Sequence, residues 1–132
     1  MTATTLLHAY LDTFAAKKAE AVARHFPVGA IYELPLLGQR LVGPREIRAG
    51  LERAFALAER CAFAIDAAQS SGDTTIAEGR LQAKLRRDRD AVEMPAAIVL
   101  QVQDGTIRRL STYLDARPYR LWSDGPVFAA TR

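Results

Sequence analysis

The sequence predicts an α+β fold, in which helices from the first half of the chain pack on one face of an antiparallel sheet from the second half. Up to about residue 60, apolar residues recur with the spacing of an amphipathic helix, and beyond it they alternate with polar residues. Runs of helices followed by runs of strands are typical of α+β domains. The 132 residues, 49% apolar and 25% charged, suffice for one domain with a substantial core.

The first two helices are expected close to the N-terminus. Residues 6–14 carry an apolar stripe at helical spacing, and Thr4 or Thr5 would cap the start of this helix. A second, shorter helix is expected over residues 19–25, where Pro27 ends it.

A short strand and a third helix complete the first half. Residues 30–34 are extended in the prediction, and a turn with Pro35 and Gly38 follows them. Because proline suits a first helical turn, Pro44 opens the third helix, whose apolar face continues to Ala58.

Four strands joined by hairpins are expected in the second half. The turn Ser71-Gly72-Asp73 and the strong hairpin signal Asp104-Gly105 separate them, together with a charged segment at residues 84–90. The expected strands are residues 63–68, 75–85, 92–102 and 107–114.

The chain has no composition break, repeat or low-complexity linker, so residues 1–132 are interpreted as one domain with a core at about 5–118 and a tail at 119–132. The lone Cys61 excludes a disulfide scaffold and is compatible with a reducing cytosol. The N-terminus lacks the pattern of a signal peptide, and no apolar stretch approaches the length of about 20 residues that spans a bilayer. We therefore expect a cytoplasmic protein without a membrane partner.

The charge balance favours no polyanionic partner. The net charge is +3, and arginine dominates the basic residues, a bias typical of a GC-rich bacterial genome. The densest basic run, residues 84–90, contains two acids and no aromatic residue, so we interpret it as a solvated hairpin. We expect no nucleic-acid partner; the alternative, binding through residues 84–89, would be strongly salt-dependent.

Three segments resemble the nuclear-transport-factor-two-like superfamily, which includes ketosteroid isomerases, limonene epoxide hydrolases, scytalone dehydratases and SnoaL-like polyketide cyclases. They are the run from Tyr10 to Pro35, the helix start at residues 43–47, and the final hairpin and strand at residues 104–115. The resemblance implies a cone in which three helices cover a curved, mainly antiparallel sheet and enclose a pocket for a small hydrophobic molecule. It also implies homodimerisation through the outer face of the sheet. It does not identify a reaction, because one fold hosts many functions.

The resemblance places Tyr10 where ketosteroid isomerases have the tyrosine that donates a hydrogen bond to the developing enolate. The alternative is a core tyrosine whose hydroxyl is bonded to a neighbour. Both acids of those isomerases are replaced: Leu34 stands at the position of the general base, and Ala97 or Ile98 at that of the protonated aspartic acid. Because neither residue can take or give a proton, we do not expect the steroid-isomerase mechanism in this protein.

Glu33 is the nearest substitute for the lost base. Strand alternation sends Tyr32 and Glu33 to opposite faces, so only one of them can point into the cone. If Glu33 points inward, burial would raise its pKa toward that of a usable base; if Tyr32 does, Glu33 faces solvent.

Glu78, Arg80 and Gln82 share one face of the strand at residues 75–85. Alignment with the isomerases places this face inside the cone, with Glu78 as a base and Arg80 as its partner. Arg80-Leu81-Gln82 is similar to the Arg-x-Asp of epoxide hydrolases, although Gln82 replaces the acid. The alternative is that Leu81 and its apolar neighbours face the core, which avoids burying a charged pair.

The leading hypothesis is a small enzyme without cofactor or metal that acts by acid–base chemistry as an isomerase, cyclase, dehydratase or hydrolase. Its catalytic residues would be Tyr10, Glu33, Glu78 and Arg80. The alternative is a binding or dimerisation module that does no chemistry. The expected lining of the pocket is Phe14, Tyr32, Leu34, Phe55, Gln82, Ile98, Leu100, Leu110, Thr112 and Asp115, although Asp115 could instead cap a turn at the end of its strand.

Overall fold

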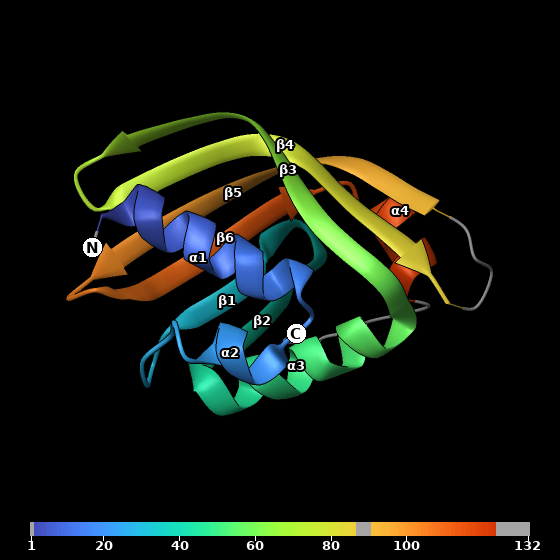
Figure 1. The fold of residues 1–132 in the computed structure, drawn as a ribbon, viewed down its shortest axis with the longest axis horizontal. Helices are drawn as coiled ribbons and strands as arrows, with labels where there is room; N and C mark the ends of the chain where they lie inside the picture. Colours follow the sequence, from blue (N-terminus) through green and yellow to red (C-terminus); the bar gives the residue numbers. More distant parts are fainter. Residues whose placement is uncertain (1, 87–90, 124–132) are drawn as a thin grey trace.

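Six strands form one curved sheet, and helices cover its concave face (Figure 1). The computed structural model describes residues 2–86 and 91–123. The strand order is β2-β1-β6-β5-β4-β3. Only β1 and β6 run parallel; all other neighbouring pairs are antiparallel. The elements are α1 (Ala3–Ala15), α2 (Ala19–Ala23), β1 (Ile31–Leu34), η1 (Pro35–Leu37), β2 (Gln39–Val42), α3 (Gly43–Leu57), β3 (Ala58–Ser71), β4 (Thr74–Leu85), β5 (Ala91–Gln103), β6 (Thr106–Leu114) and α4 (Ala116–Ser123).

The predicted α+β class and the order of the first three helices are confirmed, with a correction at the first cap. The hydroxyl of Thr2 accepts a hydrogen bond from the backbone N–H of Thr5 at 3.1 Å, so Thr2 caps α1. Thr4 lies inside the helix, where its hydroxyl is 2.8 Å from that of Ser70 at the end of β3. The apolar stripe of α1 is buried as its period predicts, including Tyr10 and Phe14.

Strand β2 is absent from the sequence-based prediction. Gly38 adopts the left-handed conformation (φ +65°) that reverses the chain after η1, and β2 then pairs antiparallel with β1. Four residues between a turn and a helix carry too little periodicity to identify a strand, and the pairing with β1 supplies what the local sequence lacks. At the end of β2, the Glu46 carboxylate accepts a hydrogen bond from Val42 N–H at 2.9 Å, which stabilises the start of α3.

The four long strands confirm the hairpin pattern, but β3 is longer than residues 63–68. It begins directly after α3, which ends at Leu57, one residue before the predicted end at Ala58. From Ala58 to Ser71, β3 pairs with β4 along nearly its whole length. The charged segment at residues 84–90 lies only partly in the structure, because residues 87–90 are outside the described ranges.

Helix α4 corrects the predicted boundary between core and tail. Residues 119–123 belong to a helix, and Tyr119 and Trp122 are both 4% exposed within the core. The Trp122 indole N–H donates to the carbonyl oxygen of Ala54 at 3.1 Å. This carbonyl lies in the last turn of α3, where backbone oxygens lack partners within the helix. The remainder of the predicted tail, residues 124–132, is outside the described ranges.

The bend of β3 over β4 depends on Gly79 (Figure 1). The register between β3 and β4 shifts between Ile65 and Ala67, which marks a bulge opposite this glycine. A Cβ atom at residue 79 would overlap the carbonyl oxygen of Ala64 and lie 3.0 Å from the Phe63 ring. The strands can therefore approach so closely only because residue 79 has no side chain.

We predict that Gly79→Ala destabilises the protein by about 2–3 kcal/mol, because the new methyl group forces the backbone of β3 to shift. Urea denaturation measures the change in the free energy of unfolding. Gly105→Ala is the control: Gly105 has φ +76° and open space around its Cβ position, so it costs only the backbone strain, about 1 kcal/mol. A loss at Gly79 no larger than that at Gly105 would contradict the account of the bend.

Candidate functional site: an apolar cavity beside two buried tyrosines

A small cavity lies between the inner face of the sheet and helices α1, α3 and α4. The cavity has a volume of about 40 Å³. Five of the predicted lining residues border it: Phe14, Tyr32, Leu34, Ile98 and Thr112, in addition to Tyr10. Eight further residues border it that were not predicted to line the pocket: Leu11, Leu51, Ala54, Phe63, Leu81, Leu114, Tyr119 and Trp122. None of these lining residues is charged.

Tyr10 and Tyr32 form the polar centre of the cavity wall. Their hydroxyl oxygens are 2.6 Å apart, and each residue is only 3% exposed. Tyr32 lies on the face of β1 that points into the cone, where it contacts Tyr10 of α1. The ring of Phe26 meets both phenol rings edge-on, with centroids 6.3 Å from Tyr10 and 5.7 Å from Tyr32. The two phenols thus belong to an aromatic cluster that also contains Phe26.

Burial keeps both phenols neutral. It raises the pKa of Tyr10 above its usual range, and the hydrogen bond from Tyr32 only partly offsets this rise. Burial also raises the pKa of Tyr32, and the neighbouring Tyr10 raises it further. When Tyr32 donates to Tyr10, the hydrogen of Tyr10 is left to donate to a ligand. The pair is therefore a neutral hydrogen-bond donor shielded from water.

Two other hydroxyl groups border the cavity, on Thr112 and Tyr119. Thr112 lies on β6 and is 8% exposed; Tyr119 lies on α4 and is 4% exposed. Neither hydroxyl is hydrogen-bonded to another group in the part of the chain that the structure describes, and neither oxygen is fully enclosed. Burial raises the pKa of Tyr119, and the nearby Tyr32 raises it further, which places the two phenols in the same region. All polar side-chain groups that face the cavity without a partner are therefore hydroxyls.

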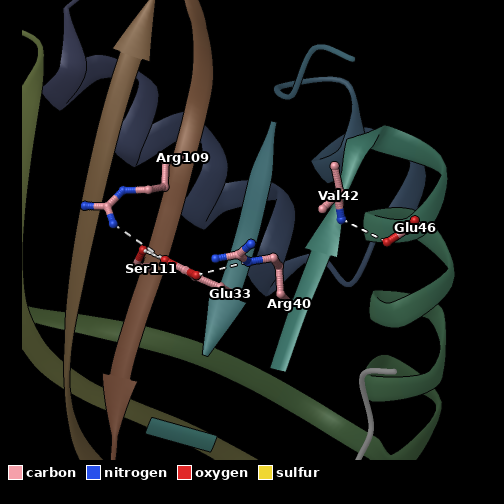
Figure 2. Close-up of polar contacts among 6 residues, drawn as sticks. All are labelled: Glu33, Arg40, Val42, Glu46, Arg109 and Ser111. Carbon is pink, nitrogen blue, oxygen red and sulfur yellow. Dashed lines mark hydrogen bonds and ion pairs between the residues drawn. The ribbon is translucent and has the colours of Figure 1, made fainter. Parts of the chain in front are cut away.

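Glu33 lies on the opposite face of the sheet, so the alternative in which Tyr32 points inward is the correct one (Figure 2). Ser111, which is fully buried, donates a hydrogen bond of 2.6 Å to Glu33 Oε2. Arg109 Nη1 lies 3.5 Å from the same oxygen, and Arg40 Nε lies 3.6 Å from Oε1. The carboxylate is only 12% exposed. Its three partners and its place outside the cone indicate a structural ion cluster between β2, β1 and β6.

Glu78 and Arg80 also point away from the cavity, which corrects their assignment as a pocket base and its partner. Both are exposed, and Leu81 lies on the inner face between them and Gln82. Arg80 contacts Asp66 at 3.4 Å and Glu93 at 3.8 Å across the outer face. The alignment with the isomerases assigned the wrong parity to β4. The correct parity keeps the charged set in water and buries the apolar set.

The other predicted lining residues do not border the cavity. Gln82 is on the outer face, where its amide donates to Glu93 at 2.7 Å. Phe55 packs edge-on against Phe14, with centroids 5.5 Å apart, behind the cavity wall. Leu100 and Leu110 are fully buried and fill the core of the sheet. Phe55, Leu100 and Leu110 are thus buried inside the cone but do not border the cavity.

Asp115 caps α4, as the alternative interpretation proposed. Its Oδ1 accepts a hydrogen bond of 3.0 Å from the backbone N–H of Arg117, and its Oδ2 lies 3.2 Å from the Arg117 guanidinium. The backbone N–H and then the guanidinium hold the pKa of Asp115 below its usual range. Asp115 is the single residue between β6 and α4, so it fixes the start of the helix that closes the cavity.

Residues 2–86 and 91–123 were also compared with the geometry of metal sites and of membrane-spanning helices. No three His, Cys, Asp or Glu side chains gather there in a way that could hold a metal ion. No helix in these ranges is long and apolar enough to cross a membrane. Cys61 lies beside the Phe14 carbonyl, and burial raises the pKa of its thiol to about 11, which makes it a poor nucleophile.

The profile of the SnoaL-like domain family matches residues 7–110. No curated protein shows significant sequence similarity to the chain. Among solved structures, it is similar to a hypothetical protein with a ketosteroid isomerase-like fold from Catenulispora acidiphila, in complex with trimethylamine, at 18% identity and a TM-score of 0.80 over 92% of this chain and 94% of that one.

Two further solved structures have the same fold. A proposed SnoaL-like polyketide cyclase from Shewanella denitrificans is 11% identical, with a TM-score of 0.82 over 92% of this chain and 96% of that one. An epoxide hydrolase from M. tuberculosis, similar to limonene epoxide hydrolase, is 18% identical, with a TM-score of 0.76 over 93% and 90%. At these identities the similarity establishes the cone fold and not the reaction.

We predict that Glu33→Gln lowers the free energy of unfolding by about 1–2 kcal/mol, because Arg40 and Arg109 lose the charge between them. Glu78→Gln is the matched control: it makes the same change on an exposed part of the same face and should cost less than about 0.5 kcal/mol. Chemical denaturation measures both. Equal effects of the two substitutions would contradict the ion cluster.

The start of α4 should depend on pH. The stabilisation from Asp115 is present above the pKa of a free aspartic acid, about 3.9, and is lost as the pH falls through the lower pKa of the folded state. The protection of the α4 amides from hydrogen exchange, relative to the intrinsic exchange rate at each pH, should therefore fall at the acid end. Asp115→Ala, which removes the acceptor for the Arg117 N–H, should show the lower protection already at neutral pH and no acid transition. The same acid transition in both proteins would show that the cap does not hold α4.

Proposed function

The chain belongs to the SnoaL-like domain family, and from this premise we propose that it binds a small, neutral, mostly apolar molecule in the cone and polarises an oxygen atom of that molecule through Tyr10. The absence of charge from the lining residues supports a neutral ligand, since burying an unpaired charge is costly. The apolar rings around the cavity would bury the body of the ligand.

The single observation that carries this proposal is the buried hydrogen bond between Tyr10 and Tyr32, 2.6 Å long. A phenol whose oxygen accepts one hydrogen bond becomes a stronger donor of the other. Tyr10 would therefore donate to a carbonyl oxygen of the ligand and stabilise negative charge that develops there. In a site without water, such a donor contributes more than it would in solution.

As an enzyme, the protein would catalyse isomerisation or cyclisation of a carbonyl compound, with Tyr10 as its catalytic residue. In these reactions the carbonyl oxygen gains negative charge as a proton leaves the neighbouring carbon. Tyr10 would stabilise that charge, and a water molecule would take the proton, since the lining residues include no carboxylate or imidazole. The name of one similar structure, a SnoaL-like polyketide cyclase, fits this class, whereas that of the epoxide hydrolase belongs to another reaction. Glu33, Glu78 and Arg80 take no part in the proposed chemistry.

The second candidate is a binding module that does no chemistry. The observation that favours it is that the cavity lining contains no carboxylate or imidazole, and so no side chain that readily accepts a proton at neutral pH. Turnover separates the two candidates: an enzyme would enolise a bound ketone faster than water does, as deuterium incorporation next to the carbonyl would reveal. Binding without exchange would favour the module.

The size of the cavity sets the scale of the ligand. Its 40 Å³ is far below the roughly 300–1,000 Å³ of sites for drug-sized molecules. Because benzene occupies a cavity of about 150 Å³ in another protein, even a ligand of one ring would have to widen this cavity, and we propose that it displaces α4, which supplies Tyr119 and Trp122 to the wall.

We also propose that the protein is a cytoplasmic homodimer that associates through the outer face of the sheet. Ile76 is 48% exposed there, and the register places Val99 beside it and Ala97 beside Tyr113 on the neighbouring strands. This partly exposed apolar strip supports an interface between two copies. Analytical ultracentrifugation distinguishes the 14.5 kDa monomer from a dimer.

We predict that Tyr10→Phe weakens the binding of cyclohexanone by about fivefold to tenfold, because the variant keeps the ring and loses the donor to the carbonyl oxygen. Calorimetric titration measures the dissociation constants. The binding of methylenecyclohexane, which has the same shape without the oxygen, should change by less than twofold.

Tyr113→Phe is the matched control, since it removes the hydroxyl of a tyrosine on the outer face and should affect neither compound. If Tyr10→Phe weakens the ketone and the hydrocarbon equally, Tyr10 only fills space and the proposal is wrong.

A further inference from the structure

Helix α4 contributes a polar group to the cavity for which the fold itself has no use. Tyr119 is 4% exposed, borders the cavity and has no hydrogen-bond partner in the described part of the chain. Its hydroxyl oxygen is not fully enclosed, so water can bind it, and a polar atom of a ligand could take the place of that water. The lone hydroxyl of Tyr119 therefore marks a place where a ligand atom would be bound.

The orientation of α4 is fixed by groups other than this hydroxyl. Asp115 holds the first turn through the Arg117 N–H, and Trp122 donates to the Ala54 carbonyl oxygen in α3. The rings of Tyr119 and Trp122 pack with centroids 5.8 Å apart, on the side of the helix that faces the cavity. The helix would keep this arrangement without the Tyr119 oxygen, so the oxygen is free for recognition.

Tyr119 and the Tyr10–Tyr32 pair reach the cavity from different secondary-structure elements. Tyr10 and Tyr32 come from α1 and β1 at the base of the aromatic cluster, whereas Tyr119 comes from the helix that closes the cavity. Tyr32 lies near enough to raise the pKa of Tyr119, but no hydrogen bond joins the two phenols. A ligand held by Tyr10 through one oxygen could thus present a second polar atom to Tyr119.

We propose that Tyr119 is a specificity-determining residue that binds a second polar atom of the ligand, so that the site takes a neutral ring compound with two oxygen functions, such as a hydroxyketone or a diketone. This inference rests on the proposed function, in which Tyr10 binds the first oxygen. Thr112, the other hydroxyl without a partner at the cavity, adds to the preference for such a ligand. A ligand with one oxygen would leave the Tyr119 hydroxyl to bind water.

The test compares cyclohexanone with 2-, 3- and 4-hydroxycyclohexanone as probes in calorimetric titrations. The native protein should bind at least one hydroxyketone about fivefold or more tighter than cyclohexanone. Tyr119→Phe, which keeps the ring, should abolish this preference and change the affinity for cyclohexanone by less than twofold. Tyr113→Phe on the outer face is the matched control and should leave the preference intact.

The outcomes separate this inference from the proposed function. If Tyr119→Phe keeps the preference, or if the native protein shows none, the inference is wrong even where Tyr10→Phe weakens all probes. If Tyr10→Phe changes nothing while Tyr119→Phe abolishes the preference, the proposed function fails and the role of Tyr119 stands. If no probe binds to the native protein at millimolar concentration, the outcome contradicts both.

Discussion

The hydrogen bond between Tyr10 and Tyr32 is the interaction around which the rest of the core is arranged. It joins the first helix to the first strand, and it is the polar contact at the centre of an otherwise aromatic cluster. The hydrogen bond offsets part of the cost of burying the two phenols there. Burial keeps both phenols neutral, and the proposed chemistry depends on the donor that this contact leaves on Tyr10.

Strand alternation decides which groups reach that contact. Because Tyr32 points inward, Glu33 must point outward, where Ser111, Arg40 and Arg109 hold it. The same alternation keeps Glu78 on the outer face of β4. The carboxylates of the sheet are therefore used for stability and solvation, and the inside of the cone is left to hydroxyl groups and apolar side chains. Because the carboxylates lie on the outer face, the residues inside the cone can offer neutral hydrogen bonds but no acid–base pair.

Much of the fold could be predicted because the spacing of apolar residues within one segment indicates whether it forms a helix or a strand. The four long strands and the first three helices carry such periods. Strand β2 and helix α4 do not: β2 is defined by its pairing with β1, and α4 is held by two aromatic side chains and a bond to Ala54. The site was more difficult to predict. Alternating residues of a strand point to opposite faces, and the local sequence does not show which set points into the cone. Tyr10 was identified, whereas the parity of β4 was not, and Tyr119 lay in an unpredicted helix.

In the proposed complex, the neutral Tyr10 hydroxyl binds an oxygen atom of the ligand inside the cone. The most direct test is the infrared stretching frequency of the carbonyl group of ¹³C-labelled cyclohexanone bound to the protein. A hydrogen bond from Tyr10 polarises the carbonyl, so the band should lie at lower frequency than in hexane and should return toward the hexane value in Tyr10→Phe. A bound ketone whose band matches that in hexane in the native protein would contradict the account.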